Sequence, residues 1–186
     1  DTVAEFLLAT YANHYRYAFA DPLKEAAAVA FGIPLQWFNS TSLKEVPHPN
    51  WNISPRKIAQ FFGTELFRER IYQLLPSIES DFWVQRMIIR LNNQYVPEDE
   101  GPLSSGDVVV IPDVRFQNEY DWIISQNGII IHLTRPGADG NIGILGHASE
   151  SSLNLWKKER TYECVNDSSI PLLQQKIANI VDSLKY

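Results

Sequence analysis

Polar side chains follow several apolar runs of the sequence at the points where those runs end. In chain order these residues are Asp21, Lys24, Asp113, Arg115, Asn118, Glu119 and Arg135. A carboxylate such as Asp113 could orient water on Mg²⁺ or contact a substrate, and the planar fork of Arg115 suits a phosphate group. Taken singly, each is more often a turn residue, a helix cap or a salt-bridge partner. Their recurrence at several run ends favours a shared site for a phosphorylated ligand.

A second group of polar residues, Arg56, Gln60 and Thr64, recurs every four positions and therefore forms one stripe along a helix. A solvated helix face is the default interpretation of such a stripe. Gly63 lies within the same helix, where glycine costs about 1 kcal/mol relative to alanine. The close approach of a ligand or of another backbone segment would explain this glycine.

Hydrophobic periodicity and helix-start signals predict the elements that position these residues. Helices are predicted at about 3–11, 21–31, 54–73, 81–91, 118–126 and 168–184, and strands at 15–20, 107–112, 128–134 and 162–166. The segments 32–52 and 96–106 are predicted to be irregular. The order strand, helix, strand is typical of an α/β protein with a parallel sheet and crossover helices.

The runs 107–112 and 128–134 have the length and β-branched content of strands buried on both faces. In an open parallel sheet the ligand lies beyond the carboxyl ends of the strands. We therefore expect the polar residues that follow these strands to converge at one edge of the sheet.

Composition limits the classes of function. The 186 residues predict a single domain, 1–186, and the net charge of −6 disfavours nonspecific binding to nucleic acid. No apolar run approaches the roughly 20 residues that cross a bilayer, so no membrane span is predicted. The lone cysteine, Cys164, and four scattered histidines indicate neither a disulfide nor a zinc motif, and a reducing cytoplasm is the expected setting.

The segment from Gly137 to Ser149 is rich in glycine and ends near His147. Flexible loops beside a phosphate site can close as lids that exclude water from a transferring phosphoryl group. We therefore expect a lid-like loop at about 135–160. His147 is more often a cap or surface histidine than a catalytic base.

Five ordered blocks of the sequence resemble those of the phage-type deoxynucleoside monophosphate kinases. They are Ser54-Pro-Arg-Lys-Ile-Ala-Gln-Phe-Phe-Gly-Thr-Glu65, Val110-Ile-Pro-Asp-Val-Arg-Phe-Gln-Asn-Glu119, Thr134-Arg-Pro-Gly137, His147-Ala-Ser-Glu150 and Asn166-Asp-Ser168. Asp1-Thr2, followed by a helix, also resembles the end of a Walker-type loop that reads Gly-Lys-Asp-Thr. The resemblance covers nearly the whole chain, and it predicts a strand and a glycine-rich loop upstream of residue 1.

The resemblance implies a three-layer P-loop kinase fold that transfers the γ-phosphoryl group of ATP to a deoxynucleoside 5′-monophosphate with Mg²⁺. It places the acceptor in a helical region at about 32–106, and a homodimer and a host cytoplasm fit the family. The implied catalytic residues are Arg56, Arg115 and Arg135. The implied substrate residues are Lys24, Gln60, Thr64, Trp83, Asp113 and Glu119, and the implied ATP residues are Asp1, Thr2, Asn166 and Asp167.

Two other functions stay open at this point. A P-loop kinase for a coenzyme A precursor would use the same sheet and phosphate clamps. A nucleotide-binding module without turnover is the other alternative, because the loop lysine that reaches the β- and γ-phosphates does not occur in the blocks above. The sequence predicts neither the Mg²⁺ ligands nor the accepted bases.

Overall fold

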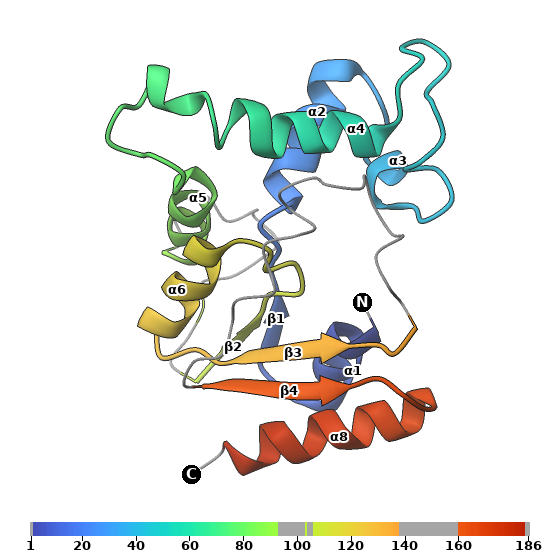
Figure 1. The fold of residues 1–186 in the computed structure, drawn as a ribbon, viewed down its shortest axis with the longest axis vertical. Coiled ribbons are helices and arrows are strands. Elements are labelled where there is room, and N and C mark those ends of the chain that lie inside the picture. Colours follow the sequence, from blue (N-terminus) through green and yellow to red (C-terminus); the bar gives the residue numbers. More distant parts are fainter. Residues whose placement is uncertain (1, 93–102, 104–105, 138–159, 185–186) are drawn as a thin grey trace. The chain divides into compact units, whose positions relative to one another are not determined.

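The computed structural model describes residues 2–92, 103, 106–137 and 160–184. The chain divides into two compact units (Figure 1). Residues 1–16 and 108–186 form the sheet unit, and residues 17–107 form the helical unit. The helical region expected at about 32–106 lies within the helical unit, which begins earlier, at Tyr17.

The sheet unit contains parallel strands and helices, which confirms the predicted α/β class. Its elements are α1 (Thr2–Thr10), β1 (His14–Arg16), β2 (Val108–Val110), α6 (Gln117–Ser125), β3 (Ile130–Thr134), β4 (Thr161–Val165) and α8 (Ile170–Ser183). Strand β1 pairs in parallel with β2, and β3 pairs in parallel with β4, so that Thr134 lies opposite Val165. This arrangement is compatible with a P-loop kinase fold.

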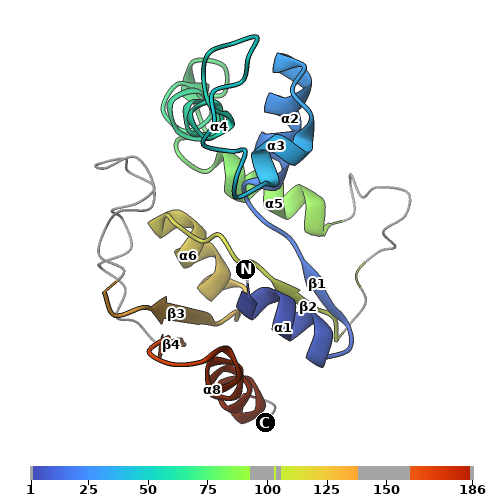
Figure 2. The ribbon, with the colours of Figure 1, turned by 90° about the vertical axis from the view of Figure 1, so that its right-hand side faces the viewer.

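Helices cover both faces of the β3–β4 pair, because successive strand residues point to opposite sides. Ile130 packs with Tyr120 of α6, and the next residue, Ile131, packs in a cluster with Leu7 of α1 and Ile177 of α8. In Figure 2, α6 and α8 accordingly lie on opposite sides of these strands. The sheet unit is therefore layered as helix, sheet and helix.

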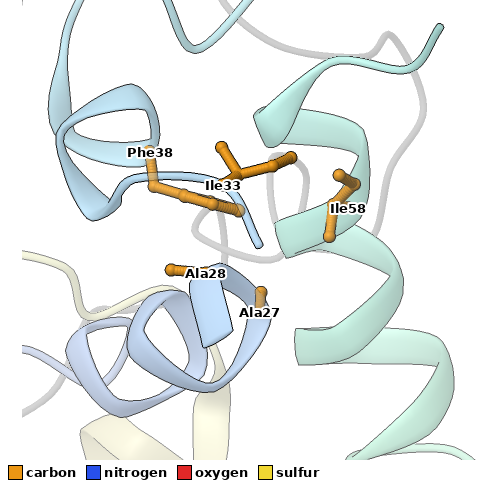
Figure 3. Close-up of a cluster of buried hydrophobic side chains, with 5 residues drawn as sticks. All are labelled: Ala27, Ala28, Ile33, Phe38 and Ile58. Carbon is orange, nitrogen blue, oxygen red and sulfur yellow. The ribbon is translucent and has the colours of Figure 1, made fainter. Parts of the chain in front are cut away.

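The helical unit is built around small and branched side chains. Its elements are α2 (Asp21–Phe31), α3 (Leu35–Asn39), α4 (Pro55–Gln60), the π-helix η1 (Phe61–Leu66), the 3₁₀ turn η2 (Ile71–Gln73) and α5 (Phe82–Leu91). Ala27 and Ala28 of α2 let Ile33, Phe38 and Ile58 pack close to the helix (Figure 3). Helix α2 ends at Gly32, whose φ of 60° lies in the left-handed region that favours glycine.

Three predictions of secondary structure need correction. The strand expected at 15–20 ends at Arg16, because Tyr17, Ala18 and Phe19 are buried in the helical unit instead of continuing the ladder. The helix expected at 54–73 is α-helical only to Gln60 and continues as η1. The segment 32–52, expected to be irregular, contains α3.

Strands β2 and β3 are also less buried than their apolar composition predicts. Val108 of β2 and Leu133 of β3 are each 43% exposed. Among the described residues the strands form two separate two-stranded sheets. Part of each apolar strand face is therefore not covered by other described residues. No helix among these residues is long and apolar enough to cross a membrane.

Candidate functional site

The segment α4–η1 presents the predicted stripe of Arg56, Gln60 and Thr64. Ser54 caps α4 by accepting a hydrogen bond from the backbone N–H of Lys57, and Pro55 occupies the first turn, as the sequence predicts. The stripe is not a solvated face, because Thr64 is only 7% exposed and both polar atoms of the Gln60 amide are buried.

The helix widens into the π-helical segment that contains Gly63. The backbone N–H of Phe67 donates to the carbonyl of Phe62, five residues earlier, and the carbonyl of Gly63 accepts the indole N–H of Trp83 at 2.8 Å. The close neighbour of Gly63 is a side chain, since an added Cβ would lie 3.1 Å from Cδ2 of Leu23. π-helical turns of this kind are frequent at functional sites.

These contacts bring four predicted substrate residues of the helical unit onto neighbouring elements. Trp83 of α5 bonds to η1, which carries Thr64 and follows Gln60, and Leu23, which approaches η1, precedes Lys24 in α2. The ammonium group of Lys24 donates to Oδ1 of Asn39 at 3.1 Å. Gln60, Thr64 and Trp83 therefore lie near the contact of α4–η1 with α5, whereas Lys24 lies on α2 beside Asn39 of α3.

The Gln60 amide is unusual within this group. Neither Nε2 nor Oε1 has a hydrogen-bond partner among the described residues, although both atoms are buried. A buried polar group without a partner costs about 1–3 kcal/mol, so such groups in proteins commonly mark a place where a ligand or water binds.

Arg56 is held at the edge of the helical unit. Its Nε forms an ion pair with Glu45, and its backbone N–H donates to the carbonyl of Lys44. The side chain of Arg56 is 15% exposed and that of Glu45 is 54% exposed. The pair therefore faces solvent on the Glu45 side, where a stronger anion could compete for the guanidinium group.

Two arginines that the sequence analysis did not select lie on the inner face of α5. Arg86 and Arg90 line a small hollow together with Ala18, Phe19, Pro22, Trp83 and Met87. The signal was present in the sequence, because Trp83, Arg86, Met87 and Arg90 are spaced as i, i+3, i+4 and i+7 and so share one helix face. Because Trp83 and Met87 are core residues, this spacing indicates that the two arginines lie on the buried face of the helix.

Glu119 of the sheet unit organises the loop that follows β2. Its Oε2 accepts the backbone N–H groups of Arg115 at 2.8 Å and Phe116 at 3.1 Å, and the residue is 2% exposed. A carboxylate that reaches back from the first helical turn satisfies backbone donors that the helix leaves free. Glu119 thereby fixes the backbone that carries Asp113 and Arg115 beyond the carboxyl end of β2.

The structure also brings together three predicted residues at the carboxyl ends of β3 and β4. The backbone N–H of Asn166 donates to the carbonyl of Thr134 at 2.7 Å, which places Asn166 beside the residue that precedes Arg135. Asp167 accepts a hydrogen bond from Lys176 of α8 at 2.7 Å. That hydrogen bond, with a further one from the backbone, holds the pKa of Asp167 below its usual value.

The remaining predictions fall at or beyond the limits of the described residues. Thr2 is exposed at the first position of α1, where backbone N–H groups favour anions. Asp1, the segment from 138 to 159 of the expected lid, and His147 lie outside the described residues. In the described ranges, His, Cys, Asp and Glu do not gather in threes that could hold a metal ion.

Most of the chain is similar in sequence to known proteins. The chain matches the deoxynucleotide monophosphate kinase family over residues 35–177, a range that contains the stripe on α4–η1, Trp83, Glu119 and the ends of β3 and β4. It is also similar to a protein of Acanthamoeba polyphaga mimivirus that carries the provisional name deoxynucleotide monophosphate kinase. The two are 29% identical over 170 residues, which cover 89% of this chain and 82% of the relative. Because the family match spans well over half of its residues, the chain belongs to the deoxynucleotide monophosphate kinase family.

Proposed function

We propose that this protein transfers the γ-phosphoryl group of ATP to a deoxynucleoside 5′-monophosphate, which yields the deoxynucleoside diphosphate and ADP. The observation that carries the proposal is the buried amide of Gln60, which has no partner among the described residues of this nucleotide kinase family member. A carboxamide offers one donor group and one acceptor, the combination that a base edge requires. Gln60 therefore suits recognition of the acceptor in the helical unit.

Neighbouring side chains support this assignment. Thr64 lies one turn beyond Gln60 and is buried, and Trp83 provides an aromatic surface that is fixed by its bond to Gly63. Lys24 supplies a positive charge from α2. Arg56 is a further acceptor residue in the proposal, because a phosphate dianion competes well with the exposed carboxylate of Glu45.

The donor nucleotide is assigned to the sheet unit. Thr2, at the start of α1, and the preceding residue of the sequence, Asp1, would meet its phosphates, and Asn166 and Asp167 would lie beside its adenine. Arg135 would approach the transferring group, with Arg115 and Asp113 beyond the end of β2 and Glu119 holding their loop in place. Transfer between two anionic phosphates needs positioning and charge neutralisation more than a strong base.

Mg²⁺ would enter with ATP. It commonly binds through one or two carboxylates, several waters and the substrate phosphates, so an all-protein cage is unnecessary. Asp113 fits this need, since a single carboxylate beyond a strand end suffices to orient a metal-bound water. The ion would lower the negative charge that the two phosphate groups bring together.

The test is ADP release from ATP and Mg²⁺ by the full-length gene product, with each of dAMP, dCMP, dGMP and dTMP as acceptor. ADP formation that depends on the acceptor is the expected result, and it would name the accepted bases. Dephospho-coenzyme A is included as a further acceptor, and ADP formation with it alone would assign the protein to another class of P-loop kinase. Nucleotide binding without ADP formation from any acceptor would contradict the proposed activity.

A further inference from the structure

The hollow on the inner face of α5 combines positive charge with an apolar wall. Trp83, Arg86, Met87 and Arg90 share one face of this helix, and Phe19 lines the hollow from another segment. The hollow between them is small and partly open to solvent, with enclosed room for about one water molecule. All of the lining residues belong to the helical unit.

The lining of this hollow is basic. Among the residues that the structure describes, it contributes two guanidinium groups and no carboxylate. Nη1 of Arg86 is buried and has no hydrogen-bond partner among the described residues. A charged donor that is removed from water without a partner is costly, so this group is suited to an anion that enters from outside.

Arg90 is fixed in place by an aromatic ring. Its Cζ lies 4.4 Å from the centroid of the Tyr17 ring, and Tyr17 is almost completely buried. A guanidinium group that stacks through its face still directs its N–H groups outward in its own plane. Arg86 and Arg90 lie one helical turn apart, so one phosphate group can contact both.

We propose that Arg86 and Arg90 bind the phosphate group of the acceptor monophosphate. This inference rests on the proposed function and adds a phosphate-binding pair to it. Two observations favour the acceptor over the triphosphate of the donor. The hollow lies within the helical unit. Trp83, which lines it, donates a hydrogen bond to the η1 segment next to the Gln60 amide, which has no partner within the described ranges.

Arg56 and Arg86 differ in whether a carboxylate neutralises their charge. Arg56 has a carboxylate partner in Glu45, whereas Nη1 of Arg86 has no hydrogen-bond partner in the described part of the chain, where the lining of the hollow also holds no carboxylate. A 5′-monophosphate carries a charge between −1.5 and −2 near pH 7 and can accept several charge-assisted hydrogen bonds. Two guanidinium groups match that charge, while a deoxynucleoside without the phosphate would gain nothing from them.

The test is isothermal titration calorimetry of the full-length protein with dAMP, dCMP, dGMP and dTMP, with the four matching deoxynucleosides and with ATP. Arg86→Gln should weaken monophosphate binding by roughly ten- to a hundredfold. Its affinity for the deoxynucleosides and for ATP should not change. Arg86→Lys, which keeps the charge and loses the planar fork, should show an intermediate loss, and Arg90→Lys should behave similarly.

Arg70→Gln is the matched control, because Arg70 is an exposed arginine of the same unit. It should leave all of these affinities unchanged. Equal weakening of monophosphate and deoxynucleoside by Arg86→Gln would overturn the inference, as would a loss confined to ATP or no loss at all. Arg86→Gln could fail to fold, and Arg86→Lys then provides the test. Unaltered monophosphate affinity in Arg86→Lys would contradict the proposed phosphate-binding role of Arg86.

The inference and the proposed function can fail separately. Monophosphate binding that depends on Arg86, in a protein that forms no ADP, would leave the phosphate pair in place and remove the kinase activity. An active kinase whose KM for the monophosphate is the same in Arg86→Lys and wild type would remove the phosphate pair and leave the activity.

Discussion

The indole N–H of Trp83 donates to the backbone carbonyl of Gly63 at 2.8 Å, across twenty positions of the sequence. This bond joins α5, which carries Arg86 and Arg90, to the π-helical segment that follows Gln60. It therefore couples the two groups of residues that we assign to the acceptor. Trp83 acts as a positioning residue in addition to lining the hollow.

Replacement of Trp83 by phenylalanine should separate positioning from packing. Trp83→Phe retains an aromatic ring and leaves the Gly63 carbonyl without its indole donor, which should lower the free energy of unfolding by about 1–3 kcal/mol. We expect KM for the monophosphate to rise more than KM for ATP. Urea denaturation and steady-state kinetics measure the two effects.

Trp51→Phe is the matched control, because the indole of Trp51 also donates to a backbone carbonyl, that of Phe31, at 2.8 Å. Trp51 is 50% exposed, so water can replace the lost bond and the stability loss should be smaller. Equal effects of the two substitutions on KM for the monophosphate would argue against a positioning role for Trp83.

Replacement of Gln60 by an apolar residue should stabilise the protein and weaken its use of the monophosphate. In Gln60→Met a side chain of similar length replaces an amide whose two buried polar atoms have no partner among the described residues. We expect the free energy of unfolding of the unliganded protein to rise by about 1 kcal/mol and KM for the monophosphate to increase at least about tenfold. Thermal unfolding with and without the monophosphate tests both parts.

The exposed Gln85 of α5 provides the comparison. Gln85→Met should change neither KM nor the stabilisation by ligand. A Gln60→Met protein that is less stable than wild type and binds the monophosphate equally well would show that the amide serves the fold alone.

Glu119 should affect the rate through the loop that it caps. Glu119→Ala leaves the backbone N–H groups of Arg115 and Phe116 without their carboxylate, which should cost about 2–4 kcal/mol of unfolding free energy. Because the altered loop carries Asp113 and Arg115, kcat should fall as well. Glu119→Gln keeps an acceptor oxygen and should recover most of the stability and part of kcat.

Chemical denaturation and single-turnover kinetics distinguish this role from direct contact with substrate. Asp121→Asn, an exposed substitution on the same helix, is the control. If Glu119→Gln had wild-type stability and lost all turnover, Glu119 would be a substrate contact and its capping bonds would be secondary.

The sequence predicted the elements whose signals are local. Ser54 and Pro55 mark the start of α4 because a cap and a proline act within one turn. Pro22 marks the start of α2, although the N-cap there is Ala20 and Asp21 is the first helical residue. All six predicted helices have a counterpart in the structure. The change to π-helical hydrogen bonding after Gln60 was not predicted, and in this segment the Gly63 carbonyl accepts a hydrogen bond from Trp83, which belongs to a distant part of the sequence.

In the candidate site, too, local features could be predicted from the sequence and features that depend on distant segments could not. The stripe of Arg56, Gln60 and Thr64 could be read from its spacing, but its burial could not, since burial depends on how α2 and α5 pack against it. Arg86 and Arg90 were overlooked because arginines on a helix usually face solvent. Their spacing with Trp83 and Met87 was the available signal.

The ion pair between Asp167 and Lys176 should make stability depend on pH in the acid range. The hydrogen bond from Lys176 is the main cause of the lowered pKa of Asp167, so the folded protein holds this carboxylate in its charged form more strongly than the unfolded chain does. The resulting stabilisation is complete above the unfolded value of 3.8, and it is lost as pH falls through the lower pKa of the folded state. The melting temperature measured from pH 5 to pH 2 should therefore fall more steeply in wild type than in Asp167→Asn.

Lys176→Met should remove the same part of the pH dependence, because it removes the partner of the carboxylate, and the double variant should lose no more than either single one. High salt should weaken the effect, since the carboxylate is exposed. If Asp167 also lies beside the adenine of ATP, Asp167→Asn should raise KM for ATP at neutral pH, whereas Lys176→Met should raise it less. An unchanged KM for ATP in Asp167→Asn would confine this residue to holding α8 against the end of β4.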